Sequence, residues 1–169
     1  MTNLGLMQRQ TRDPLARRSL ERSLAIREGL AREHPTSSDF QIELAKSTLF
    51  LAAVQAAAGQ TDEALVNIKK AEHIAEQFPE VNKANILYNL ACAYAQCGAG
   101  AGHAKGGLSA AEREAYADRA MAVMGQAIKA GFADRAILRR DIDLDSLRPR
   151  GDFQELMMDQ SFPADPFQH

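Results

Sequence analysis

The sequence predicts an all-α protein built from paired antiparallel helices. Alanine is abundant and β-branched residues are sparse, which favours helices because alanine loses no side-chain entropy in them. Apolar residues recur at spacings close to 3.6 in several segments, separated by short turns that contain glycine or proline. No segment alternates in the manner of a strand or hairpin. With 46% hydrophobic and 25% charged residues, the composition is that of a globular domain.

The first predicted helix covers residues 14–33. Leu20, Leu24 and Leu30 recur at helical spacing. Pro14 suits a first turn because its missing N–H would have no partner there. The helix should end at Pro35, since the residue before a proline disfavours the α region.

Two further helices follow. Ser38 and Gln41 form a predicted capping box for one that runs until Gly59. The next should begin at Thr61, with acceptors and negative charge in its first turn, and end before Pro79.

The rest of the chain is predicted to be helical on both sides of a glycine-rich stretch. A helix over about 82–97 precedes residues 98–107, where the glycines should end it. Ser109 and Glu112 predict a second capping box for a helix over about 110–130 that Gly131 stops. Residues 134–159 predict two or three short helices, with Asp134 and Asp152 as candidate caps.

A pattern of large and small residues recurs along these helix pairs. The clearest copy comprises Leu87, Leu90, Ala91, Tyr94, Ala120, Met124 and Ala127. A middle copy comprises Leu51, Ala52, Gly59, Ala64, Ile68, Ala71 and Pro79. A partial first copy comprises Leu4, Gly5, Ala16, Leu20, Ser23 and Pro35.

This pattern resembles the tetratricopeptide repeat (TPR) family. In the middle copy, Thr48 and Gln55 stand where the family has apolar or aromatic residues. The resemblance implies a right-handed α-α superhelix of helix pairs, closed by a short helical cap because an end repeat has one unburied face. A generic helical bundle is the alternative.

The expected organisation is one TPR-like domain over residues 1–160. It comprises a partial repeat over 1–36, a repeat over 37–80 and a repeat with the glycine-rich insertion over 81–131. A helical cap over 132–160 and a frayed tail over 161–169 complete it. The pattern predicts that the chain begins within a helix, so we expect that end either to fray or to pair with a second copy in a homodimer.

Three segments sharpen the resemblance. Residues 25–35, 87–94 and 143–156 are similar to the C-terminal TPR regions of planctomycete-type bacterial serine/threonine kinases. The similarity implies the accessory region of a larger bacterial signalling protein. The chain contains no kinase signature, so we expect a non-catalytic protein that binds another protein and needs no cofactor.

The resemblance also implies a binding site. In the TPR family, the first helices of successive repeats line a concave groove that holds the partner. The matching positions of this chain are Lys46, Leu49, Ala53, Ala57, Asn85, Tyr88, Asn89, Cys92 and Gln96. Lysine would meet a carboxylate, the asparagines would bind a peptide backbone, and Tyr88 would be an anchor. The alternative is that these polar side chains are merely solvated.

Other candidate sites have weaker patterns. Cys92, Cys97 and His103 are a possible metal or small-ligand site, but four residues separate the cysteines and zinc sites usually have four ligands. The alternation of Asp141, Asp143 and Asp145 lacks the glycine and glutamate of a calcium loop. The glycine-rich stretch lacks the ending of a phosphate loop. We therefore expect neither a metal nor a catalytic residue.

Charge and hydropathy exclude two further classes. The net charge is −2 and the arginines of the first third alternate with acidic residues, so nucleic-acid binding is not expected. No apolar run approaches the length of about 20 residues that spans a membrane. The two cysteines predict no disulfide framework, and the start lacks a signal-peptide pattern. These features favour the cytoplasm.

Overall fold

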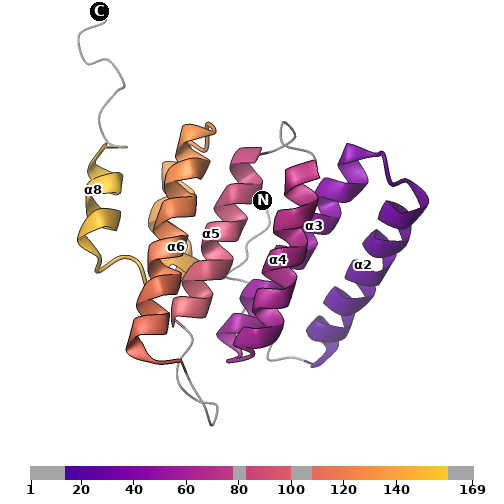
Figure 1. The fold of residues 1–169 in the computed structure, drawn as a ribbon, viewed down its shortest axis with the longest axis horizontal. Coiled ribbons are helices and arrows are strands. Elements are labelled where there is room, and N and C mark those ends of the chain that lie inside the picture. The colour runs from indigo at the N-terminus through magenta and orange to yellow at the C-terminus, as the bar shows by residue number, and fades with distance from the viewer. Residues whose placement is uncertain (1–13, 78–82, 100–107, 160–169) are drawn as a thin grey trace, which may run out of the picture.

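The structure is a computed structural model, and it describes residues 14–77, 83–99 and 108–159. Every regular element in these ranges is helical, and no strand occurs in them. The predicted all-α class is therefore confirmed for this part of the chain. Figure 1 shows the helices side by side, from α2 (Pro14–Glu33) at one end of the row to α8 (Gly151–Asp159) at the other.

The elements between these ends follow the predicted order closely. They are α3 (Ser38–Ala57), α4 (Thr61–Gln77), α5 (Lys83–Ala99), α6 (Ala110–Lys129), α7 (Arg135–Arg140) and the short 3-10 helix η1 (Ile142–Leu144). The predicted pairing of the N-terminus and the predicted tail over 161–169 lie outside the described residues.

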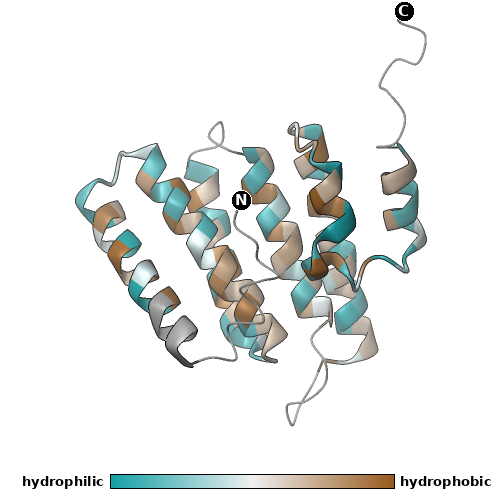
Figure 2. Ribbon diagram, turned by 180° about the vertical axis from the view of Figure 1, so that it is seen from behind, coloured by the Kyte–Doolittle hydropathy of each residue, from teal (hydrophilic) through white to brown (hydrophobic). Residues whose placement is uncertain are grey.

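Helices α3 and α5 are the central elements. Helix α3 packs against α2, α4 and α5, whereas α5 packs against α3, α4, α6 and η1. Both helices are rich in alanine, and small side chains let neighbouring helix axes approach closely. The alanines that are at most 1% exposed on these helices are Ala45, Ala52, Ala53, Ala56, Ala91, Ala93 and Ala95. Hydrophobic and hydrophilic residues alternate along the outer helices, as Figure 2 shows.

Several predicted helix ends are confirmed. The Ser109 side chain accepts a hydrogen bond from the Glu112 N–H, and the Glu112 carboxylate accepts one from the Ser109 N–H, which completes the capping box. Asp134 caps α7 by accepting a hydrogen bond from the Ile137 N–H at 3.0 Å. Gly59 and Gly131 have φ angles of 79° and 99°, a conformation that ends a helix and that L side chains rarely adopt.

The predicted Ser38–Gln41 capping box is wrong. Helix α3 has Ser37 at its N-cap, and no side chain caps it. The Gln41 amide instead donates a hydrogen bond to the Ala31 carbonyl oxygen at 2.8 Å. A bond to the preceding helix therefore replaces the local bond that the spacing indicated.

The two residues that depart from the repeat pattern have partners in the fold. The fully buried Thr48 hydroxyl donates to the Leu44 carbonyl oxygen at 2.8 Å. The Asn67 amide of α4 donates to the Gln55 side-chain oxygen of α3 at 2.7 Å. Polar groups at these two positions are thus satisfied within the helix pair.

Gly98 lies within α5, although the sequence predicts that the helix ends at this glycine-rich stretch. A Cβ atom added at Gly98 would lie 3.0 Å from the Arg113 carbonyl oxygen and 3.3 Å from the Ala117 nitrogen. The absence of a side chain therefore allows the close contact of α5 with α6.

This contact predicts that Gly98→Ala lowers the free energy of unfolding by about 1–3 kcal/mol, because backbone atoms of α6 must move away. Urea unfolding followed by circular dichroism would measure it. Gly125→Ala is the matched control: nothing lies within 4 Å of a Cβ there, and alanine should stabilise α6 by up to about 1 kcal/mol. Equal stability of the Gly98→Ala protein and the wild type would contradict the prediction.

The C-terminal segment forms a cap on α5 and α6. Its buried anchors are Leu138, Leu144, Leu147 and Phe153. The Arg150 guanidinium, just before α8, forms ion pairs with α6, at 2.5 Å from the Glu114 carboxylate and 2.6 Å from the Asp118 carboxylate.

Among the described helices, none combines the length and apolar character that a membrane span requires.

Candidate functional site

The predicted groove residues of α3 divide into exposed and buried ones. Lys46 is partly exposed, and its ammonium lies 2.8 Å from the Glu43 carboxylate. Ala57 is exposed at the end of the helix. Leu49 and Ala53 are each only 1% exposed and belong to the hydrophobic core. Lys46 is therefore the predicted polar contact that α3 presents to solvent.

Two asparagines lie one helical turn apart on α5. Asn85 is exposed and Asn89 is half-buried. Neither amide has a side-chain hydrogen bond within the described part of the chain, so both retain donors and acceptors. Because α3 packs against α5, these amides and Lys46 lie on neighbouring helices.

Tyr88, the predicted anchor, is only 7% exposed. Its ring stacks on Phe132 with a centroid distance of 4.2 Å and an interplanar angle of 5°. Its hydroxyl donates a hydrogen bond to Asp141 Oδ2 at 2.5 Å. In this structure Tyr88 contacts the C-terminal cap, so its side chain offers little surface to a partner.

Gln96 also contacts the cap. Its amide nitrogen lies 3.1 Å from the Asp143 carbonyl oxygen and 3.2 Å from Asp143 Oδ1, and it donates to both. Nearby, the Ser146 hydroxyl donates to the Ala95 carbonyl oxygen at 3.2 Å. The cap therefore covers the part of α5 that carries Gln96.

Cys92, Asp141 and Asp143 form a polar group between α5 and η1, which we call the α5–cap cluster. One ligand atom from each residue lies within 4.8 Å of the other two. Cys92 is 1% exposed and Asp143 is fully buried, whereas Asp141 is partly exposed. The Asp143 N–H donates to Asp141 Oδ1 at 3.0 Å, which fixes the turn between them.

Burial perturbs the acids around this cluster. Desolvation raises the pKa of the Cys92 thiol well above its ordinary value, and the charges of Asp141 and Asp143 add to the rise. Desolvation likewise raises the pKa of the Tyr88 hydroxyl, and the Cys92 charge and the Asp141 hydrogen bond raise it further. Both groups are therefore protonated at neutral pH.

The structure separates residues that sequence patterns grouped together. Cys97 is buried and is not among the ligand atoms that meet Cys92, and burial raises its thiol pKa to about 12. His103 lies outside the described residues. Asp145 is exposed and pairs with Arg148 at 2.7 Å, so it does not join Asp143 in a calcium-type loop.

The sequence analysis missed the partners of Tyr88. Phe132 directly follows the glycine that ends α6, and Asp141 ends α7. The only signals for them are an aromatic residue after a helix stop and an aspartate before an apolar turn. Neither signal indicates that the chain folds back on α5.

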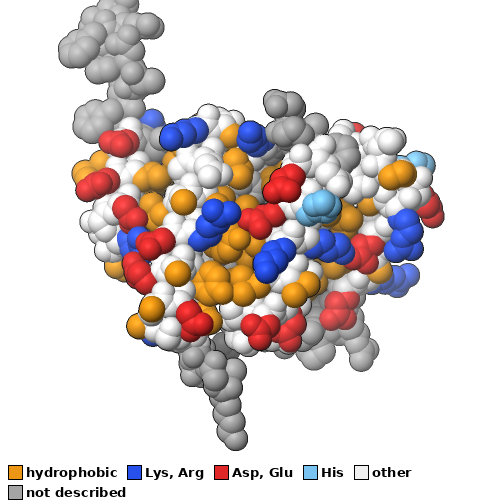
Figure 3. Space-filling view, viewed as in Figure 1, with side chains coloured by type: hydrophobic (Ala, Val, Ile, Leu, Met, Phe, Trp, Pro, Cys, Tyr) orange, Lys and Arg blue, Asp and Glu red, His pale blue; other side chains and the backbone are white. Residues whose placement is uncertain are grey.

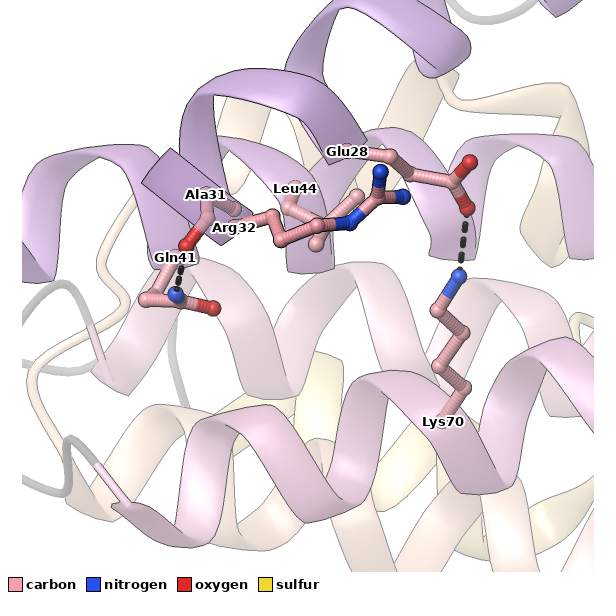
Figure 4. A pocket seen from close by; sticks show the side chains of 6 residues that line it. All are labelled: Glu28, Ala31, Arg32, Gln41, Leu44 and Lys70. Atoms are coloured by element: carbon pink, nitrogen blue, oxygen red, sulfur yellow. Dashed lines mark hydrogen bonds and ion pairs between the residues drawn. The ribbon is translucent and has the colours of Figure 1, made fainter. Parts of the chain in front are cut away.

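A shallow hollow lies where α2, α3 and α4 meet (Figure 4). The buried Ala31 and Leu44 line it, and the Lys70 ammonium lies 2.5 Å from the Glu28 carboxylate at one end. Gln41 bonds to Ala31 at the other end. The hollow is open and its one carboxylate, that of Glu28, is already paired with Lys70. We therefore assign it no catalytic or binding role.

The surface in Figure 3 carries basic and acidic side chains next to one another. The Arg119 guanidinium lies 3.6 Å from the Glu72 carboxylate and over the ring of Tyr94, at 5.7 Å from its centroid. No protein-family model, curated protein or solved structure matches the chain.

Proposed function

We propose that this chain is a TPR-like helical repeat module that binds a protein or peptide partner and catalyses no reaction. It would act as an accessory region of a larger bacterial signalling protein in the cytoplasm. The partner would lie across α3 and the first half of α5, where Lys46, Asn85 and Asn89 are accessible.

The observation that carries the proposal is the asparagine pair on α5. The two amides lie one turn apart and have no side-chain hydrogen bond among the described residues, so they are suited to bind the N–H and C=O groups of an extended backbone. Lys46 on the neighbouring helix adds a positive charge, and its pair with Glu43 is exposed and therefore weak. A carboxylate of the partner would compete for it.

The cap limits this site. Tyr88 and Gln96 are engaged with Asp141 and Asp143, and the cap that holds them contains the fully buried Leu144 and Leu147. The proposed site is accordingly shorter than a groove that runs the full length of α5.

A pull-down from lysate of the source organism would test the proposal. The test variant combines Lys46→Ala, Asn85→Ala and Asn89→Ala, and leaves the buried Tyr88 in place. We expect it to lose the partner band and to retain its helicity. The matched control combines Lys69→Ala and Gln126→Ala, which are exposed on α4 and α6 and should leave the band unchanged.

Equal bands from the test variant and the wild type would remove the site from α3 and α5. No band from any of the proteins would favour the alternative, self-association. Light scattering over a range of concentrations would then show a dimer.

A further inference from the structure

Two groups of potential metal ligands that the proposed function leaves unused meet in the fold. Cys92 lies in the middle of α5, and Asp141 and Asp143 flank the start of η1, far along the chain. Their sulfur and oxygen ligand atoms all lie within 4.8 Å of one another. The residues thus converge from two elements that α6 and α7 separate in the sequence.

We propose that the α5–cap cluster binds a divalent metal ion of the zinc type through Cys92, Asp141 and Asp143. Zinc accepts both thiolate sulfur and carboxylate oxygen, and three protein ligands with one water are a known zinc arrangement. A thiol does not suit calcium or magnesium, which take oxygen ligands. The site is independent of the partner-binding face.

Neighbouring side chains orient these ligands. The Tyr88 hydroxyl donates to Asp141 Oδ2 at 2.5 Å, and the Asp143 N–H donates to Asp141 Oδ1 at 3.0 Å. The Gln96 amide donates to Asp143 Oδ1 at 3.2 Å. Hydrogen bonds of this kind hold the carboxylate ligands of metal sites in place.

Burial and charge favour a cation at this position. Cys92 and Asp143 are inaccessible to water, and burying acidic groups beside one another is costly unless a proton or a cation offsets their charges. A bound zinc ion would lower the pKa of the thiol and release its proton. The partly exposed Asp141 would provide the route of entry.

The distances require a small adjustment. Zinc lies about 2.3 Å from sulfur and about 2.0–2.2 Å from oxygen, so tetrahedral ligands lie roughly 3.5 Å apart. The ligand atoms lie within 4.8 Å of one another, so each pair would have to approach by at most about 1.3 Å to reach that spacing. The Asp141 and Asp143 side chains would have to rotate to supply that movement.

Titration of the reduced protein with Co²⁺, followed by near-ultraviolet and visible absorption, would test the site. We expect a sulfur-to-cobalt charge-transfer band that saturates at one equivalent and that Zn²⁺ abolishes. Cys92→Ala and Asp143→Asn should each remove the band. Cys97→Ala is the matched control, because Cys97 is a buried thiol of the same helix outside the cluster.

Gln96→Leu tests the orienting role. It should keep the charge-transfer band but weaken Co²⁺ binding about tenfold. The melting temperature provides a second readout, since an ion that binds only the folded state raises it. Zn²⁺ should raise it for the wild type and Cys97→Ala but not for Asp143→Asn.

Three results would overturn the proposal: no saturable band with the folded wild type, a band that persists in Cys92→Ala, or loss of the band in Cys97→Ala. Circular dichroism establishes the fold of each variant. If Cys92→Ala does not fold, the isosteric Asp143→Asn decides, and a band of unchanged affinity in that variant rejects the site.

Discussion

Leu144→Ala is expected to lower the free energy of unfolding by about 2–5 kcal/mol. Leu144 is fully buried in η1, where the cap meets α5. Truncation to alanine loses the transfer free energy of the removed carbons and leaves a cavity, since packed neighbours collapse only in part. Chemical unfolding monitored by circular dichroism would measure the loss.

Ile142→Ala is the matched control for Leu144→Ala. The two residues share the same short 3-10 helix, but Ile142 is 39% exposed. Its truncation should therefore cost well under half as much, because much of its surface already contacts water. Similar losses for both variants would show that η1 does not dock on α5 through Leu144.

The order and extent of the helices could be predicted because their ends depend on local chemistry. The Ser109–Glu112 box and the positive φ angles of Gly59 and Gly131 involve residues close in sequence. Such signals need no knowledge of the tertiary structure. Ser38 and Gln41 show the limit of this reasoning, since the Gln41 amide binds Ala31 of the preceding helix.

The site could be predicted only in part, because exposure depends on contacts between distant segments. The resemblance to tetratricopeptide repeats implied that Asn85 and Tyr88 both face a groove, yet Asn85 is exposed and Tyr88 is buried. The difference arises from Phe132 and Asp141, which stack on and accept a hydrogen bond from Tyr88. Nothing in the local sequence around Tyr88 indicates those partners.

The same contacts explain why the α5–cap cluster escaped the motif analysis. A search for ligand spacing compares residues close in sequence, and it groups Cys92 with Cys97. In the fold, Cys92 instead meets Asp141 and Asp143. The fold of the cap thus determines both the length of the proposed binding face and the composition of the proposed metal site.

High pH is expected to destabilise the protein steeply through Cys92 and Tyr88. Both pKa values are raised in the folded state, first by desolvation. The metal-free folded state therefore retains two protons that the unfolded chain releases above the ordinary pKa values of 9.0 for the thiol and 10.0 for the hydroxyl. The contribution of these two groups to the free energy of unfolding is fully present below pH 9 and is lost as the pH rises above it.

Each group should lower the free energy of unfolding by about 1.4 kcal/mol for every pH unit above its ordinary pKa. By pH 11 the two groups together should lower it by roughly 4 kcal/mol. Tyr88→Phe isolates the contribution of the hydroxyl. The variant loses the hydrogen bond to Asp141, which should cost about 1 kcal/mol at neutral pH. Above pH 10, however, its stability should fall by about 1.4 kcal/mol less per pH unit than that of the wild type.

Urea unfolding between pH 7 and 11 would measure these slopes, and comparison of variants cancels the titration of lysines. Tyr116→Phe is the control: desolvation also raises the pKa of Tyr116, but its side chain is only partly buried, so its removal should change the slope less. If the free energy of unfolding of Tyr88→Phe falls with pH as steeply as that of the wild type above pH 10, the Tyr88 hydroxyl ionises without opening the cap. The contact of Tyr88 with Asp141 would then not be what couples α5 to the cap.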